Sequence, residues 1–343
     1  MSAGKKIAAG VIALLAIGLG VFLYGGWQMF GDELKAIRSL KMIEDKVYTF
    51  TYKGDYGFKG FLEQGGAKTD AEMAVYIAGF LSKGYMKMPS SDEVPMEAGC
   101  TALDAAGAFG RNFDFEDQGQ SVVIVRTEPD DGYKSISTST FAFLGFGPDW
   151  HPVAGMDGFM ALASIYVPLD GMNEKGLCVA DLIELDGDTA AFDTPKPDLT
   201  IVGAIRLVLD YAASVDEALE LLERYDVHPS IGKAHHLSVA DGKRAVAVEW
   251  KDGRMHVTET SSVTNHCLWE SRPGEMTAES RGRLEAIRNL SPVNMQDCLD
   301  AIKSASYDDF TIWTALFDRE TLEGTWYFRT DWDKPVSFEV CDR

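Results

Sequence analysis

The chain has 343 residues, of which 46% are hydrophobic and 25% charged, enough to build one large or two modest globular domains. Its net charge of −21, without any cluster of Lys and Arg, excludes nucleic acid as an expected partner. No G-x-S-x-G elbow, Walker loop or H-E-x-x-H helix is present, which disfavours serine, phosphate and zinc chemistry.

The chain opens with an apolar run. Two lysines precede residues 7–30, which carry no charge and exceed the roughly 20 apolar residues that span a bilayer. A cleavable secretory signal is the alternative, but its apolar region is usually about 7 to 15 residues long and ends at a small-residue site. We predict an uncut single-pass anchor over 7–30. The charges on either side of it predict a cytoplasmic tail over residues 1–6 and an extracytoplasmic remainder.

Residues 31–99 are expected to form a separate, removable pro-segment with a small core. We predict three elements in it, a short amphipathic helix, a hairpin or loop, and a capped helix, over residues 31–44, 47–66 and 73–81. The polar stretch 88–95 contains two prolines and predicts an exposed linker that ends near Cys100. Such a linker suits a cleavage junction.

Blocks of strands alternate with pairs of helices in residues 100–343. The predicted strands lie at residues 100–103, 108–115, 121–126, within 154–167, and at 237–240, 244–250, 254–258, 311–317 and 325–329. The predicted helices lie at 199–213, 214–225, 277–290 and 294–304. This order implies stacked antiparallel sheets covered by helices, an α+β layered sandwich.

Cys100 is the candidate nucleophile, because it follows Gly99 at the end of the predicted linker. If the chain is cut between these two residues, the freed α-amine, with a pKa near ~8, can take the thiol proton. Arg111 would favour the thiolate and Asp114 would orient the ammonium. Three residues apart on a strand, these two side chains point to opposite faces, so we expect a bulge near Asn112 to bring both to Cys100.

The remaining candidates have structural interpretations. His235 and His236 cannot share a face of a strand, and no histidine set suggests a metal. Residues 173–176 predict a turn with Gly176 at positive φ. Five cysteines without Cys-x-x-Cys or zinc spacing leave at least one thiol free; the other four could form disulfides, but we favour buried thiols. Neither a metal nor a cofactor is expected.

Several motifs resemble those of the choloylglycine hydrolase family and occur in the same order as in that family, which contains bile salt hydrolases and penicillin V acylases. They are Cys100-Thr101, Gly110-Arg111-Asn112-Phe113-Asp114, Asp170-Gly171-Met172-Asn173-Glu174-Lys175-Gly176-Leu177, Val263-Thr264-Asn265 and Ser280-Arg281. The first two are also similar to acid-ceramidase-like amidases, which carry a helical segment ahead of the nucleophile. The resemblance implies an N-terminal-nucleophile hydrolase with a four-layer αββα fold over residues 100–343, and a homo-oligomer, since relatives are often tetramers.

The resemblance also implies site roles. Cys100 is the nucleophile with Arg111 and Asp114 beside it, the Asn265 side chain donates to the oxyanion, and Arg281 lies in the active-site network. Ile183 stands where relatives place an Asn or Tyr, so only its backbone N–H can serve the oxyanion. The spacing from Cys100 to Arg111 is shorter than in bile salt hydrolases, and the loop before Arg281 is short. The resemblance therefore does not imply bile salt specificity.

Together these features predict a membrane-anchored, extracytoplasmic amidase that cuts itself between Gly99 and Cys100 and hydrolyses linear, non-peptide N-acyl amides through a thioester. The alternatives are an acyltransferase that uses the same thioester, and an uncut, non-catalytic binding protein. The expected partners are a small N-acyl amide and the membrane. Apolar side chains expected to form an acyl pocket are Trp150, Phe159, Met160, Trp269 and Met276.

Overall fold

The computed structural model describes residues 25–26, 28–84, 98–116, 119–153, 155–184, 194–269, 278–307 and 310–341. Most of the predicted anchor, the whole predicted linker at 88–95 and Met276 therefore lie outside the described residues. Within these ranges, none of the helices combines the length and the apolar character needed to cross a membrane.

A nine-stranded sheet forms the larger part of the molecule. Its strand order is β1-β2-β5-β6-β7-β8-β11-β12-β13. In that order the strands are β1 (Lys41–Glu44), β2 (Val47–Lys53), β5 (Val122–Glu128), β6 (Ser135–Thr140), β7 (Asp170–Asn173), β8 (Cys178–Glu184), β11 (Ala234–Ala240), β12 (Ala245–Lys251) and β13 (Arg254–Glu259). Neighbouring strands are antiparallel except β2 and β5, which pair in parallel.

A six-stranded antiparallel sheet packs against the first. It contains β14 (Ser262–Val263), β3 (Ala98–Ala105), β4 (Ala108–Phe115), β15 (Thr311–Asp318), β16 (Glu323–Phe328) and β17 (Val336–Glu339). Two tryptophans cross the interface: Trp313 Nε1 donates to Asp170 at 2.8 Å, and Trp326 Nε1 donates to Thr138 at 2.7 Å. The space between the sheets is thus a packed core with a few paired polar groups.

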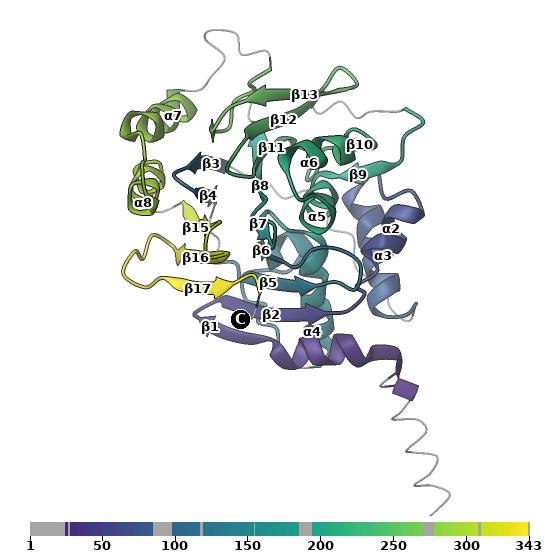
Figure 1. The fold of residues 1–343 in the computed structure, drawn as a ribbon. Coiled ribbons are helices and arrows are strands. Elements are labelled where there is room, and N and C mark those ends of the chain that lie inside the picture. The colour runs from purple at the N-terminus through teal and green to yellow at the C-terminus, as the bar shows by residue number, and fades with distance from the viewer. Residues whose placement is uncertain are drawn as a thin grey trace, which may run out of the picture.

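Helices cover the outer faces of both sheets (Figure 1). The pair α7 (Ala278–Leu290) and α8 (Met295–Ser304) packs on β3 and β4. Near the larger sheet lie α2 (Phe58–Glu63), α3 (Asp70–Leu81), α4 (Met156–Ala161), α5 (Ile201–Tyr211), α6 (Val215–Leu222) and the 3-10 helices η1 (Phe141–Leu144) and η2 (Leu162–Tyr166). The parallel pair β9 (Asp198–Thr200) and β10 (Asp226–His228) joins α5 and α6 to this layer. The α+β class is confirmed.

The N-terminal segment differs from the prediction, because it shares the large sheet instead of folding separately. The helix spans residues 28–39, and residues 41–44, expected to continue it, form β1. The predicted hairpin or loop over 47–66 contains β2 and α2. All seven residues of β2 pair with β5, and its first four are buried. An interior strand is buried on both faces, so its sequence lacks the alternation of apolar and polar residues that identifies a half-buried strand.

The other helices and strands largely follow the prediction. The expected strand pair within 154–167 is wrong: α4 and η2 occupy it, since a short apolar run does not distinguish a strand from a buried helix. The α3 cap is as expected, with Glu72 N donating to Thr69 Oγ1 at 3.2 Å. Gly176 has φ 77° in the predicted turn.

Candidate functional site

The β3–β4 hairpin positions Cys100. Its turn uses Ala106 and Gly107 at φ 53° and 81°, and the two strands pair without a register shift from Ala98 to Ala105. Cys100 lies opposite Phe113, so both side chains project from the same face, into the space between the sheets. The Cys100 residue is only 2% exposed.

Arg111 and Asp114 lie on opposite faces of β4, so the bulge expected near Asn112 is absent. Arg111 shares the Cys100 face, where its guanidinium carbon lies 4.8 Å from the centre of the Phe113 ring. Asp114 faces α7 and accepts a 2.5 Å hydrogen bond from Thr311 on β15. The only register shift along β4 occurs in its pairing with β15. Strict alternation therefore holds, and the two charges approach Cys100 from different sides.

The Arg111 guanidinium is fixed by the larger sheet. Its Nε lies 3.0 Å from Asp170 Oδ2, and its Nη2 donates to the main-chain oxygen of Asp181 at 2.7 Å. Both Arg111 and Asp170 are fully buried. A buried, paired guanidinium is a stable positive charge on the thiol's side of the hairpin.

Asn265 binds the main chain of the nucleophile. It follows β14, the edge strand that pairs with β3. Its Oδ1 accepts the Cys100 N–H at 2.5 Å, and its Nδ2 donates to the main-chain oxygen of Ile183 at 2.7 Å. The amide therefore bridges the two sheets directly beside Cys100.

Arg283, and not Arg281, is the arginine of α7 that reaches the site. Its Nη1 donates to the Cys100 main-chain oxygen at 2.5 Å and lies 3.7 Å from Asp114 Oδ2, while its Nη2 donates to Asn265 Oδ1 at 2.7 Å. Arg281 is exposed. Helix periodicity provides the missed signal: Arg283 lies four residues before the buried Ile287, whereas Arg281 lies on the solvent side.

Strand β8 directs main-chain oxygens to the site. Its neighbour β7 pairs only as far as Ala180, and beyond that point Asp181 O binds Arg111 and Ile183 O binds Asn265. In an antiparallel strand the N–H and C=O of one residue point to the same side. The Ile183 N–H is therefore directed towards Asn265, and its oxyanion role stays a prediction.

Burial has the largest effect on the pKa values of Cys100 and Asp114. It raises the pKa of the Cys100 thiol above its ordinary value, and the Arg111 guanidinium offsets part of that rise. Burial also raises the pKa of Asp114 to about 7, against the opposing effects of Arg283 and the Thr311 hydroxyl. The uncut thiol is thus a weak nucleophile until another base or charge assists it.

A second buried polar cluster includes Cys267, two residues after Asn265. The ligand atoms of Glu184, Glu249 and Cys267 lie within 4.8 Å of one another and could hold a metal ion. The His236 Nδ1 lies 3.4 Å from Glu249, and the Lys251 ammonium lies 3.2 Å from Glu184. Since that ammonium already supplies positive charge, the cluster is explained without a metal.

The remaining predictions concern two histidines, the cysteines and the residues of the expected acyl pocket. His235 and His236 lie on opposite faces of β11, as expected. All five cysteines lie within the described ranges, and none of them forms a disulfide. The expected acyl-pocket residues do not share partners: Trp150 stacks on Phe146, Phe159 packs on Phe30, and Trp269 stacks on His256. Beside Cys100, instead, Phe113 stacks on Trp313 and Phe115 and contacts Phe143 edge-on.

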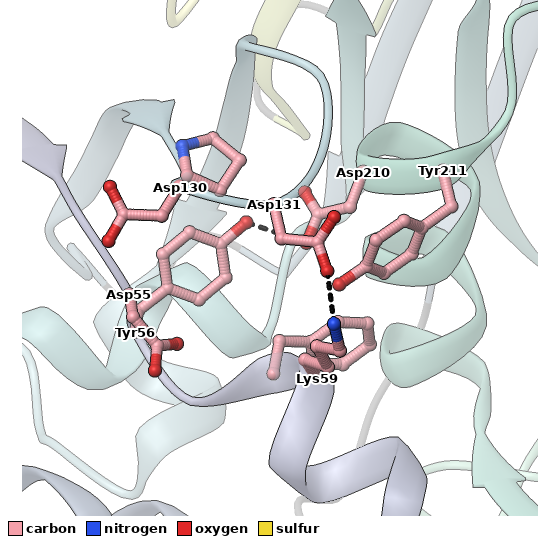
Figure 2. Close-up of a pocket in the computed structure, with 9 residues that line it drawn as sticks. Asp55, Tyr56, Lys59, Asp130, Asp131, Asp210 and Tyr211 are labelled. Carbon is pink, nitrogen blue, oxygen red and sulfur yellow. Dashed lines mark hydrogen bonds and ion pairs between the residues drawn. The ribbon is translucent and has the colours of Figure 1, made fainter.

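An acidic pocket of about 210 Å³ lies elsewhere, between the N-terminal segment and the loop after β5. Figure 2 shows Tyr56 bonded to Asp210, and Lys59 paired with Asp131. Asp210 also pairs with Arg206 at 3.0 Å. The positive charge of Arg206 thus already compensates its buried carboxylate, and no Cys, Ser or Thr is among the residues that line the pocket.

Comparisons with known proteins found a matching family and similar solved structures. The chain matches the family "Acyl-coenzyme A:6-aminopenicillanic acid acyl-transferase" over residues 101–328. A mutant of the conjugated bile acid hydrolase from Clostridium perfringens superposes with a TM-score of 0.50 at 15% identity, covering 71% of this chain and 92% of the other. A second variant of that hydrolase gives 0.50 at 12% identity, with the same coverage of both chains. Penicillin V acylase from Agrobacterium tumefaciens gives 0.47 at 17% identity, covering 70% of this chain and 84% of the other.

A search of curated protein sequences found no match. The likeness to the bile acid hydrolase structures shows a shared fold, and together with the family match it confirms the resemblance seen in the motifs. The family description names an enzyme, so the prediction that the chain is an enzyme is confirmed as well. Because the family match covers well over half of the sequence, the chain belongs to the acyl-coenzyme A:6-aminopenicillanic acid acyl-transferase family.

Proposed function

We propose that this protein is a self-processing cysteine amidase that cuts the Gly99–Cys100 bond and then hydrolyses N-acyl amides through a thioester on Cys100. One observation carries the proposal: Asn265 and Arg283 bind the two main-chain polar groups of Cys100, while its side chain shares a strand face with Arg111. A cysteine with a purely structural role does not need side-chain hydrogen bonds to both of its main-chain polar groups. The layering of helices outside two packed sheets supports the four-layer αββα arrangement of these hydrolases.

Maturation would begin with attack of the Cys100 sulfur on the carbonyl carbon of Gly99. The C–N bond breaks, the thiol proton passes to the leaving nitrogen, and a thioester joins Gly99 to the sulfur. Water then hydrolyses the thioester and leaves a free α-amine on Cys100. The Asn265 Oδ1 that accepts the uncut N–H is placed to accept from this amine, with Arg283 and Asp114 adjoining it.

Turnover would use the same atoms. The α-amine takes the thiol proton, the sulfur attacks the substrate carbonyl, and the Asn265 Nδ2 and the Ile183 N–H stabilise the oxyanion. The amine then returns the proton to the leaving nitrogen, and water releases the acid from the thioester. Asp114 and Arg283 would keep the amine in place.

The site favours an acyl group with apolar character. The aromatic stack of Phe113, Phe115, Phe143 and Trp313 adjoins the Cys100 face and offers apolar contact area. The named activities of the two structural neighbours, on conjugated bile acid and on penicillin V, suggest N-acyl compounds as the first substrates to test.

Acyl transfer to an amine is the second candidate, since the family description names a transferase. Both activities share the thioester, and only the acceptor differs. Adding an amine to a turnover assay separates them, because a transferase converts the acyl group to a new amide while a hydrolase releases free acid.

We also propose that the apolar run over residues 7–30 anchors the protein in a membrane, with the catalytic part outside the cytoplasm. Its length and flanking charges support this. Fractionation of cells that express the full chain, with protease added to intact cells, tests the orientation.

The decisive experiment is the intact mass of the purified protein. We expect a chain that begins at Cys100, and we expect Cys100→Ala to remain whole and inactive on a panel of N-acyl amides. Cys298→Ala, which removes a buried thiol of α8, is the matched control and should still be cut. Normal turnover by Cys100→Ala would refute the proposal, because the Cys100 sulfur would then not be the nucleophile.

A further inference from the structure

His235 is held in its charged form by its two hydrogen-bond partners. Its Nδ1 lies 2.8 Å from the carboxylate of Asp181, and its Nε2 lies 3.0 Å from the main-chain oxygen of Ser230. A carbonyl oxygen can only accept, and an ionised carboxylate can only accept. With Asp181 ionised, both ring nitrogens carry a proton, and the buried side chain is an imidazolium. Asp181 raises the pKa of His235 in spite of burial, in agreement with this assignment.

The partner of this imidazolium belongs to the part of β8 that binds the site. Asp181 presents its side chain to His235 and its main-chain oxygen to Arg111. Ile183, two residues further on, pairs directly with His235 in the β8–β11 register and binds Asn265. The His235–Asp181 pair thus adjoins both backbone contacts that hold Arg111 and Asn265 against Cys100.

The same histidine is connected to the N-terminal segment. Asp70, the first residue of α3, accepts hydrogen bonds from the Ser230 hydroxyl and from the Ile231 N–H, each at 2.9 Å. Ile231 has φ 49°, a conformation that a β-branched residue rarely adopts without support. Asp70 therefore fixes the turn whose Ser230 carbonyl receives the His235 N–H.

We propose that His235 is a positioning residue that neutralises Asp181 beside Cys100, and that Asp70 of the N-terminal segment holds it there, so that the excised segment tunes the reactivity of the nucleophile. This inference rests on the proposed function. The segment then has a role after cleavage as well as before it. The charged groups that face His235 are Asp181 on β8 and Asp70 on α3.

Removal of the imidazolium would leave the Asp181 charge uncompensated. That charge raises the pKa of Cys100. In His235→Gln the midpoint of the pH profile for alkylation of Cys100 should therefore move upward by roughly one pH unit. The double variant His235→Gln/Asp181→Asn removes both charges and should return the midpoint to within a few tenths of a unit of the wild type.

The test measures iodoacetamide labelling of Cys100 by peptide mass, as a function of pH, in the purified protein. His228→Gln is the matched control, because His228 is also buried and pairs with Asp198 at 2.6 Å, but lies on β10 away from the site. It should lose similar stability and keep the wild-type midpoint. If His235→Gln has the same midpoint as His228→Gln, the proposal is wrong.

A second pair of variants tests the link to the segment and remains informative if His235→Gln fails to fold. Asp70→Asn should shift the midpoint in the same direction by a smaller amount, while Glu72→Gln, in the same first turn of α3, should not. Equal midpoints for these two variants contradict the role of the segment. Labelling does not require turnover, so a wild-type chain that stays uncut refutes the proposed function without deciding this test.

Discussion

Arg283 and Asn265 are joined by a hydrogen bond of 2.7 Å from the guanidinium Nη2 to the amide Oδ1. The same guanidinium reaches the Cys100 main-chain oxygen and the Asp114 carboxylate. One side chain of α7 therefore connects three groups that come from β3, β4 and the loop after β14. Its position depends on the packing of α7 against the six-stranded sheet.

Arg283→Gln is expected to abolish self-cleavage and to destabilise the fold by about 3 kcal/mol, because it leaves the buried Asp114 without its cationic neighbour. Arg281→Gln, two residues away and exposed, should behave as the wild type. Gel analysis of cleavage and thermal unfolding of both variants give the comparison. Equal cleavage in the two variants would show that Arg283 is not needed.

A side chain at position 99 should slow self-cleavage. A Cβ there would lie 3.3 Å from the Arg283 Nη2 and 3.5 Å from the Tyr307 ring. Gly99→Val should therefore be cut more slowly than Gly99→Ala, and Gly99→Ala more slowly than the wild type. Gly147→Ala, where a Cβ meets nothing within 4 Å, is the control. Cleavage time courses by mass spectrometry decide the order.

Asn265→Ala should fold but turn over about 10²- to 10³-fold more slowly, the usual effect of losing one oxyanion donor. The change should appear mainly in kcat. Asn112→Ala removes another buried amide, which donates to Ile302 O at 2.8 Å on the α8 face, and should lower stability without affecting kcat. If the two variants have the same kcat, the oxyanion role of Asn265 is wrong.

Asp114 should make stability depend on pH. Its pKa is raised from 3.8 to about 7 by burial, so the folded protein holds the proton more tightly than the unfolded chain. The resulting stabilisation is complete below about 3.8 and is lost as the pH rises to about 7. The Asp114→Asn variant lacks this pH-dependent stabilisation. Its Tm relative to the wild type should therefore increase across that interval, and a constant difference would contradict the pKa shift.

The two products of self-cleavage should remain together. β2 lies between β1 and β5, and its seven residues form ladder bonds that a cut at Gly99 does not break. Both chains should elute in one peak on size exclusion and separate only in denaturant. Elution of the fragment from Cys100 onward as a free monomer would refute this prediction.

The sequence predicted much of this architecture, and the failures have physical causes. Capped helices such as α3 and α6 were recognisable because a capping box is a local signal. β2 was not, because its burial on both faces arises from strands distant in the chain. At the site, motifs identified Cys100 and Asn265 as neighbours. Arg283 was missed because the choice between two arginines depends on which face of α7 packs inward, and His235 because its partner lies on another strand.

The interior position of β2 also bears on how this protein can be produced. A recombinant polypeptide that starts at Cys100, designed to skip the maturation step, would expose the β5 backbone along seven residues. Open edges of this kind invite pairing between molecules. Such a shortened product should collect in inclusion bodies, and co-expression of the missing N-terminal piece from a second gene should restore solubility.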